Sequence, residues 1–149
     1  MMEELIVRKI ENGSVIDHIA VGNGLKVLNI LKLNHEETAV LLMNVLSKKL
    51  GRKDIVKIEN RELTMDEVNK ISLVAPNATL NIIENGEVKE KKKVILPSIL
   101  ENIAKCPNTN CITNFNEPMR TKFIVEKKEP VKLRCWYCER LFNSEEIIV

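Results

Sequence analysis

The sequence predicts an α+β fold with a small second domain at its C-terminal end. β-rich segments and two helical segments follow one another in the order ββ-α-ββ-α-ββ, which usually gives a mostly antiparallel, ferredoxin-like sheet with both helices on one face. All four cysteines lie after residue 105. We therefore expect a first domain over residues 1–97, a linker over residues 98–105 and a cysteine-containing domain over residues 106–149.

The first domain is predicted to open with a hairpin. Residues 5–10 and 15–21 are rich in aliphatic and β-branched side chains, and Asn12-Gly13 between them favours the positive φ angles of a type I′ turn. A helix is expected next, over residues 25–33, where leucines recur at helical spacing.

The middle of the first domain combines two strands with a well-marked helix. Residues 38–46 are predicted to form a buried strand, apolar enough to lie at an edge or an interface, and residues 54–59 the strand after it. Thr64 and Glu67 are spaced as a capping box, in which each side chain accepts a hydrogen bond from the backbone N–H of the other residue. Pro76 ends the helix that they begin.

A second hairpin completes the predicted sheet. Its strands are residues 78–83 and 88–95, joined by another Asn-Gly turn at residues 85–86. After Pro97, residues 98–104 are expected to form a short helix or a linker.

The four cysteines form two pairs whose spacing predicts one structural zinc site. Cys106 and Cys111 are separated by four residues, Cys135 and Cys138 by two, and 23 residues lie between the pairs. Two such pairs complete the tetrahedral shell of one Zn²⁺ ion and leave no position open for a substrate. The 44 residues from 106 to 149 are also too few to fold readily without a metal or disulfides.

Strands over residues 121–126 and 130–134 are expected to connect the two cysteine pairs in a small antiparallel domain. Two alternative roles for the cysteines fit the pattern less well. Four unrelated buried cysteines would make the pairing coincidental. A redox pair at Cys135 and Cys138 would open no helix of a βαβ unit and would leave the first pair without a role.

Composition restricts the class of protein. The formal net charge is +2, far less basic than is usual for a protein that grips the nucleic-acid backbone. No apolar run reaches the roughly 18 residues that span a bilayer, and the acidic N-terminus lacks the basic start of a secretory signal. We therefore expect a cytoplasmic protein with no membrane or nucleic-acid partner, whose cysteines stay reduced and bind metal.

Five motifs occur in order along the chain. They are Val15-Ile16-Asp17-His18-Ile19; Gly51-Arg52-Lys53-Asp54 leading to Lys57-Ile58-Glu59-Asn60; Ala75-Pro76-Asn77-Ala78-Thr79; Cys106-Pro107-Asn108-Thr109-Asn110-Cys111-Ile112; and Cys135-Trp136-Tyr137-Cys138-Glu139. With them the chain resembles the regulatory chain of aspartate carbamoyltransferase across nearly its whole length. No single motif is specific, but several in order within one short chain are.

The resemblance implies a regulatory subunit that catalyses nothing itself. It implies an N-terminal allosteric domain that binds nucleoside triphosphates, with CTP inhibiting, UTP assisting and ATP activating. It also implies a C-terminal zinc domain that docks on the catalytic chain. Regulatory chains of this family pair as homodimers, which tie catalytic trimers into a larger assembly that controls pyrimidine biosynthesis.

The same resemblance assigns residues to both surfaces. The effector-binding residues would be Arg8, Lys9, Ile10, Asp17, His18, Lys57, Asn81, Ile83, Val88 and Lys91. The subunit-interface residues would be Asn108, Asn110 and Glu139. Two positions depart from the family pattern: Arg8-Lys9 stands where an acidic and a small residue are expected, and Gly86 where a bulkier side chain is familiar.

The chemistry of these residues suits a triphosphate. Lys57 and Lys91 are expected on neighbouring strands, where their ammonium groups can act as point charges for phosphate, and Asp17 can accept hydrogen bonds from ribose hydroxyls. The sequence has no Gly-rich P-loop, which argues against hydrolysis but not against binding. The simpler alternatives are solvated lysines, an ion pair between Asp17 and Arg8 and asparagines that only shape the turn between cysteines.

Two other functions remain open on the residues alone. A zinc-ribbon nucleic-acid-binding protein could stack bases on Trp136 and Tyr137, although residues 106–149 carry seven Lys/Arg against six Asp/Glu and are nearly neutral. A metalloenzyme would need an open coordination position, which four cysteine ligands do not leave.

Overall fold

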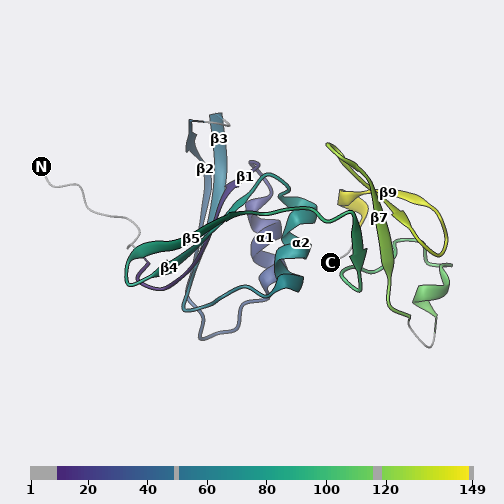
Figure 1. Ribbon diagram of the computed structural model, residues 1–149, viewed down its shortest axis with the longest axis horizontal. Helices are drawn as coiled ribbons and strands as arrows, with labels where there is room; N and C mark the ends of the chain where they lie inside the picture. The colour runs from purple at the N-terminus through teal and green to yellow at the C-terminus, as the bar shows by residue number, and fades with distance from the viewer. Residues whose placement is uncertain (1–9, 49–50, 116–118, 148–149) are drawn as a thin grey trace, which may run out of the picture. The chain divides into compact units, whose positions relative to one another are not determined.

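The fold is given by a computed structural model that describes residues 10–48, 51–115 and 119–147. Each of its two sheets is antiparallel, and the predicted α+β class is confirmed (Figure 1). None of the helices in these ranges is both long and apolar enough to cross a membrane.

The chain divides into two compact units. The first unit comprises the residues up to 63 together with residues 77–93, and the second comprises residues 64–76 together with residues 94–149. The two predicted helices therefore fall in different units.

The first unit is built on a five-stranded sheet in the order β2-β3-β1-β4-β5. Its strands are β1 (Gly13–Ile19), β2 (Ala39–Ser47), β3 (Gly51–Glu59), β4 (Thr79–Glu84) and β5 (Glu87–Lys93). Helix α1 (Gly24–Leu31) contacts β2 and β3 and buries Val27 and Leu31 in the core. One face of the sheet is thus covered by α1.

Alternation along the strands gives the sheet a second, open face. Ile16 pairs with Val56 across β1 and β3, and both side chains are fully buried. Successive side chains of a strand point to opposite faces. Val15, Lys57 and Asn81, which pair with one another across β3, β1 and β4, therefore share the open face.

A buried carboxylate on β3 holds the covered face together. Asp54 is fully buried, and its Oδ2 accepts hydrogen bonds from the backbone N–H groups of Gly22 at 3.1 Å and Gly24 at 3.0 Å. Its Oδ1 accepts a third from the N–H of Asn44, at 2.8 Å, where β2 has a bulge. A Cβ at Gly24 would lie 2.8 Å from the same carboxylate, so only glycine lets the start of α1 approach it.

The two Asn-Gly pairs behave differently. At the β4–β5 hairpin, Asn85 has φ 53° and Gly86 has φ 78°, as a type I′ turn requires, so that prediction is confirmed. The prediction of the same turn at Asn12-Gly13 is wrong, because Asn12 lacks a positive φ and Gly13 is the first residue of β1. Gly13 is needed there because a Cβ would collide with the carbonyl oxygen of Ile58. Most of the first predicted strand, residues 5–9, lies outside the described residues.

The prediction that strand β2 is buried is wrong, and the edge position that its apolar sequence also allowed is observed. It lies at the edge of the sheet with β3 as its one neighbour, and the side chains of Met43 and Leu46 are 57% and 77% exposed. An apolar run indicates a strand but does not say where in the sheet it lies. The first unit consequently has an apolar edge strand, a feature that proteins usually protect.

The second unit combines helix α2 (Met65–Val74) with a four-stranded sheet in the order β6-β7-β8-β9. The predicted capping box is confirmed: the Glu67 N–H donates to Thr64 Oγ1 at 3.2 Å, and the Thr64 N–H donates to Glu67 Oε1 at 3.0 Å. The remaining elements are β6 (Ile99–Glu101), η1 (Ile112–Asn114), β7 (Lys122–Lys128), β8 (Val131–Cys135), β9 (Leu141–Asn143) and η2 (Ser144–Glu146).

Residues 98–104, predicted as a short helix or linker, instead contain strand β6. Leu100 on β6 pairs with Phe123 on β7, and both are buried. They belong to a core that also holds Leu73 of α2, Leu133 of β8 and three of the four cysteines. The cysteines are therefore part of the hydrophobic core of this unit.

The Asp54→Asn substitution should lower the free energy of unfolding of the first unit by about 3 kcal/mol. The amide has one acceptor oxygen and turns its NH₂ group toward backbone N–H donors that the carboxylate satisfies. Urea unfolding of the metal-loaded chain, followed by circular dichroism, measures the change. Glu36→Gln, which neutralises an exposed carboxylate, is the matched control, and equal stability of the two variants would contradict the role given to Asp54.

Candidate functional site

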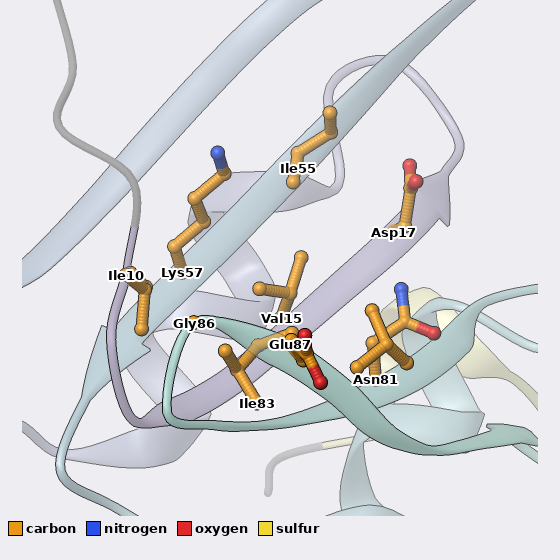
Figure 2. A pocket seen from close by; sticks show the side chains of 10 residues that line it. Ile10, Val15, Asp17, Ile55, Lys57, Asn81, Ile83, Gly86 and Glu87 are labelled. Atoms are coloured by element: carbon orange, nitrogen blue, oxygen red, sulfur yellow. The ribbon is translucent and has the colours of Figure 1, made fainter.

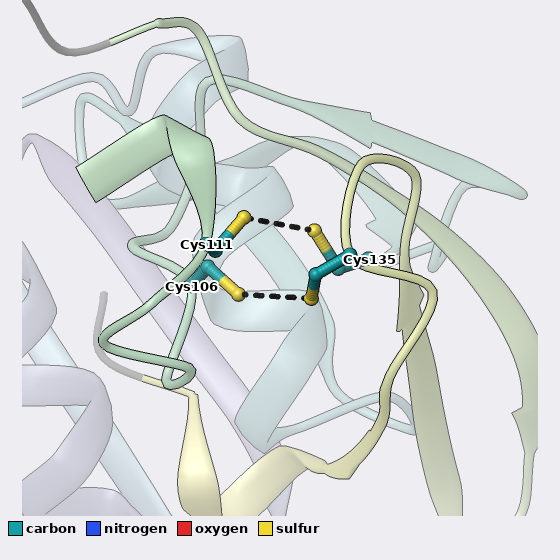
Figure 3. Close-up of side chains that lie close together, drawn as sticks. Cys106, Cys111 and Cys135 are labelled. Carbon is teal, nitrogen blue, oxygen red and sulfur yellow. Dashed lines mark hydrogen bonds between the residues drawn. The ribbon is translucent and has the colours of Figure 1, made fainter. Parts of the chain in front are cut away.

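The four predicted cysteine ligands come together in the second unit. The sulfur atoms of Cys106, Cys111, Cys135 and Cys138 all lie within 4.8 Å of one another. The Sγ–Sγ distance is 3.8 Å both for Cys106–Cys138 and for Cys111–Cys135. Figure 3 shows Cys106 and Cys111 on one loop, facing Cys135 on another.

The distances between sulfur atoms fit a shared metal ion and not disulfides. A disulfide needs about 2.05 Å between its sulfurs. Four thiolates at about 2.3 Å from one tetrahedral ion lie about 3.8 Å from each other, which is the separation of the two pairs. The cage is the right size for one ion, and protein sulfurs fill all four positions.

The first cysteine pair is held by a turn, here called the first knuckle, over residues 106–114. Asn108 O accepts a hydrogen bond from the Cys111 N–H at 2.9 Å, and Asn108 Oδ1 accepts another from the Asn110 N–H at 3.1 Å. Asn114 Nδ2 donates to two carbonyl oxygens of the knuckle, at 2.9 and 2.8 Å. These bonds use the side chains of Asn108 and Asn114 to fix the loop that presents the two sulfurs.

The second pair is held by a tighter turn, the second knuckle, over residues 135–140. The Cys135 N–H donates to Arg140 O at 3.0 Å, and the Glu139 N–H donates back to Cys135 O at 2.9 Å. Glu139 adopts a left-handed conformation with φ 63°, and its carbonyl oxygen accepts a hydrogen bond from Arg134 Nη1 at 2.8 Å. The turn closes on itself, with both sulfurs directed toward the first knuckle.

The thiols of the cage differ in acidity because their surroundings differ. Burial raises the pKa of the Cys106 thiol, against a hydrogen bond from the backbone N–H of Asn108. Burial also acts to raise the pKa of Cys138, but hydrogen bonds from the backbone N–H of Arg140 and from the Asn108 side chain outweigh it and lower that pKa to about 7. Asn108 thus contributes to both knuckles.

Further donors point at the remaining sulfurs. Burial raises the pKa of the Cys135 thiol, and hydrogen bonds from the backbone N–H groups of Cys138 and Tyr137 oppose this. Thr113 Oγ1 donates to Cys111 Sγ at 3.2 Å. A divalent ion with four thiolates carries a net charge of about −2, so these donors stabilise the metal-bound form through charge-assisted hydrogen bonds.

A second site lies on the open face of the first sheet. It is a cavity of about 490 Å³, within the range of roughly 300–1,000 Å³ that is usual for small-molecule sites. Six of the ten predicted effector-binding residues line it: Ile10, Asp17, Lys57, Asn81, Ile83 and Val88. Figure 2 shows Ile10 and Ile83 toward one end of this hollow and Asp17 and Asn81 toward the other.

The other predicted effector residues lie elsewhere. Arg8 and Lys9 lie outside the described residues, as does any ion pair between Arg8 and Asp17. His18 sits in the bulge of β1 with φ 60°, and its Nδ1 lies 2.9 Å from Thr79 Oγ1. Lys91, on β5, is beside the cavity lining and pairs with Asn81.

Lys57 and Lys91 were expected on neighbouring strands, and this is wrong. Register pairs Lys57 with Val15, Val15 with Asn81, and Asn81 with Lys91. The two lysines therefore stand at the ends of one row that crosses four strands, about 14 Å apart at three strand spacings. The long-range strand order separates them, so that Lys57 lines the cavity and Lys91 lies beside its lining.

Lys53 provides a cation at the polar end of the cavity. Its Nζ lies 2.8 Å from Asp17 Oδ1, which also accepts a hydrogen bond from the His18 N–H at 2.6 Å. Burial alone would raise the pKa of Asp17, but the hydrogen bonds from Lys53 and His18 outweigh it and hold that pKa below its usual range. Asp17 is thus ionised at neutral pH.

Sequence reasoning missed Lys53 and Asn114. Lys53 lies in the Gly51–Asp54 motif, and alternation places it on the opposite face from the buried Asp54. That alternation could have identified Lys53 as a residue of the open face. Asn114 lies three residues after Cys111, and nothing local indicated that its amide would reach back to the first knuckle.

The predicted interface residues lie on or beside the two knuckles. Asn110 and Glu139 are exposed, whereas Asn108 is half-buried and its side chain is engaged within the cage. The structure thus brings Asn108, Asn110 and Glu139 to the surface around the cysteines, while Asn108 also shapes the knuckle itself.

Comparison with known proteins identifies both parts of the chain. Residues 5–95 match the family model described as "Aspartate carbamoyltransferase regulatory chain, allosteric domain", and residues 98–148 match the one described as "Aspartate carbamoyltransferase regulatory chain, metal binding domain". The aspartate carbamoyltransferase regulatory chain of Pyrococcus horikoshii is 57% identical over 150 residues, covering 99% of this chain and 98% of that protein.

Two further relatives carry the same name. The regulatory chain of Methanocaldococcus jannaschii is 51% identical over 143 residues, covering 96% of this chain and 95% of that protein. The regulatory chain of Ignicoccus hospitalis is 50% identical over 150 residues, covering 98% of this chain and 96% of that protein. The similarity therefore extends over both units.

Replacing one ligand, in Cys111→Ser or Cys138→Ser, should reduce the metal content below one ion per chain and expose β7 and β8 to hydrogen exchange. The reason is that the cysteines belong to the core that these strands share. Metal analysis together with amide exchange measures both effects. Thr109→Ala, on the exposed part of the first knuckle, should change neither. A metal-free Cys111→Ser chain with full protection of β7 and β8 would contradict the structural role of the ion.

Proposed function

This chain belongs to the family of aspartate carbamoyltransferase regulatory chains, and we propose that it controls a catalytic chain by binding nucleoside triphosphates. The observation that carries the proposal is the match of both parts of one chain, in order, to the two parts of that family. The chain is regulatory and not itself an enzyme; its relatives are named regulatory chains, and its first part matches an allosteric domain.

The proposed ion in the cysteine cage is Zn²⁺, one per chain. Four thiolates in a closed tetrahedral arrangement are typical of structural zinc sites. Since no ligand position is open, the ion serves to shape the two knuckles. In the proposed division of the chain, residues 1–97 form the allosteric domain, residues 98–105 a connection, and residues 106–149 the zinc domain.

The proposed effectors are CTP and ATP, with UTP as a further ligand, and the proposed site is the cavity on the open face. Its apolar end, with Ile10, Ile83 and Val88, suits a nucleobase, and Asp17 suits ribose hydroxyls. Lys57 in the cavity lining and Lys91 beside it supply positive charge for the phosphates. The proposed effector-binding residues also include Arg8, Lys9 and His18, which rest on the family resemblance.

The surface around the knuckles is proposed to dock on the catalytic chain. It presents Asn110 and Glu139 as exposed polar groups beside Asn108. Because the cage fixes both knuckles, docking should depend on the metal. Regulation would then be a population shift, in which each nucleotide favours the activity state that binds it more tightly, with a coupling free energy of about 1–3 kcal/mol.

Strand β2 is the proposed contact between two copies of this chain. It is an edge strand whose outer N–H and C=O groups have no strand beside them among the described residues. The exposed side chains of Met43 and Leu46 add apolar area to that edge. An edge of this kind is stabilised by pairing with its counterpart, which gives a homodimer. We place the assembly in the cytoplasm, where the cysteines stay reduced.

The binding of CTP and ATP to the complete assembly should be measurable by calorimetry. The Lys57→Met substitution should weaken both nucleotides at least about tenfold, since about 1.4 kcal/mol corresponds to a factor of ten and a lysine–phosphate contact is charge-assisted. Lys26→Met, on the exposed side of α1, changes the net charge equally and should leave affinity unchanged. If the assembly binds neither CTP nor ATP, the effector proposal fails.

Assembly itself should require the metal. The chain should copurify with the catalytic chain of its own organism when zinc is present, and the complex should dissociate when a chelator removes the ion, because the knuckles lose their shape. Size-exclusion chromatography with metal analysis of each peak measures this. A complex that persists with zinc-free regulatory chain would show that docking is independent of the cage.

A further inference from the structure

The second knuckle exposes a large aromatic side chain. Trp136, the one tryptophan in the sequence, lies between the ligands Cys135 and Cys138 and is 51% exposed. Its neighbour Tyr137 is 39% exposed. Together they place two amphipathic aromatic rings on the surface beside the metal cage.

Two contacts connect Trp136 to strand β7. The backbone N–H of Trp136 donates to Lys122 O at 2.8 Å, which ties the knuckle to the first residue of β7. The Nζ of Lys122 lies 4.2 Å from the centre of the ring, within the distance of a cation–π contact. Glu101 Oε1 lies 4.0 Å from the same ammonium group. One part of the ring is therefore supported by the protein and the rest faces outward.

This arrangement is suited to binding a protein. Tryptophan and tyrosine are enriched among the few residues that carry most of the binding free energy at interfaces. A ring that already contacts Lys122 loses less conformational entropy on binding than a fully free one. When the chain is unbound, the same ring leaves apolar area in contact with water, and burying that area against a partner is favourable.

We propose that Trp136, supported by Lys122, is the anchor of the interface with the catalytic chain. The inference rests on the proposed function, in which the zinc domain docks on that chain, and it names the residue that supplies most of the affinity. Trp136 shares its knuckle with Glu139, which the proposed function also places in that interface, and both residues are exposed. The complementary surface on the catalytic chain is an apolar pocket for the indole, with an acidic group near it to meet the Lys122 ammonium.

The unique tryptophan allows a direct test in the complete complex. The regulatory chain is labelled with 5-fluorotryptophan, so that fluorine NMR reports only on position 136, and the unlabelled catalytic chain is added. The fluorine signal is expected to shift and broaden as the complex forms, and its exposure to solvent is expected to fall. A complex that forms with no change in this signal would overturn the proposal.

The affinity of the catalytic chain for variants gives an independent result. Trp136→Ala should weaken the complex at least about 30-fold, as expected for an anchor residue, and Trp136→Phe should weaken it less. Ile95→Ala, which truncates another apolar residue of the same unit that is 70% exposed, should have little effect. Equal affinity of the Trp136→Ala and wild-type chains would also overturn the proposal.

A misfolded variant can be told apart from a failed proposal. Metal content and circular dichroism of each variant show whether its knuckle is intact, and the fluorine experiment uses the wild-type sequence, so it does not depend on the folding of any variant. If the wild-type chain does not bind the catalytic chain at all, the proposed function fails. If a single-stranded oligonucleotide moves the fluorine signal and the catalytic chain does not, Trp136 is a stacking surface and the anchor proposal is overturned.

Discussion

The second unit depends on four sulfur atoms brought within 4.8 Å of one another. Cys106, Cys111 and Cys135 lie in the same buried cluster as Phe123 and Leu133, so the metal cage and the hydrophobic core are one structure. Without an ion, neighbouring thiolates would repel one another, and neutral thiols would leave the hydrogen-bond donors of both knuckles without a charged acceptor. The shape of the surface around the knuckles therefore follows from the ion.

In the first unit, one face of the sheet is packed into the core and the other face carries the cavity. The covered face is packed by α1 and fixed by the carboxylate of Asp54. The neighbouring residue, Lys53, points to the open face and pairs with Asp17 at the polar end of the cavity. Alternation along β3 thus places a structural carboxylate and a site cation on consecutive residues.

Local features of this fold could be predicted from sequence, and long-range ones could not. The Thr64–Glu67 capping box, the Asn85-Gly86 turn and the cysteine pairs depend on residues a few positions apart, and all three were predicted correctly. The separation of Lys57 from Lys91 and the pairing of β6 with β7 depend on strand order, which periodicity does not encode. The failure at Asn12-Gly13 is of the same kind, because a contact with Ile58, distant in sequence, determines the role of that glycine.

The central claim is that one zinc ion held by four cysteines gives the second unit its shape. X-ray absorption at the zinc edge, on chain purified without added metal, tests it most directly. The expected result is one zinc per chain with four sulfur ligands at about 2.3 Å and no nitrogen or oxygen ligand. A correctly folded, reduced chain without metal, or a zinc shell with fewer than four sulfurs, would contradict the claim.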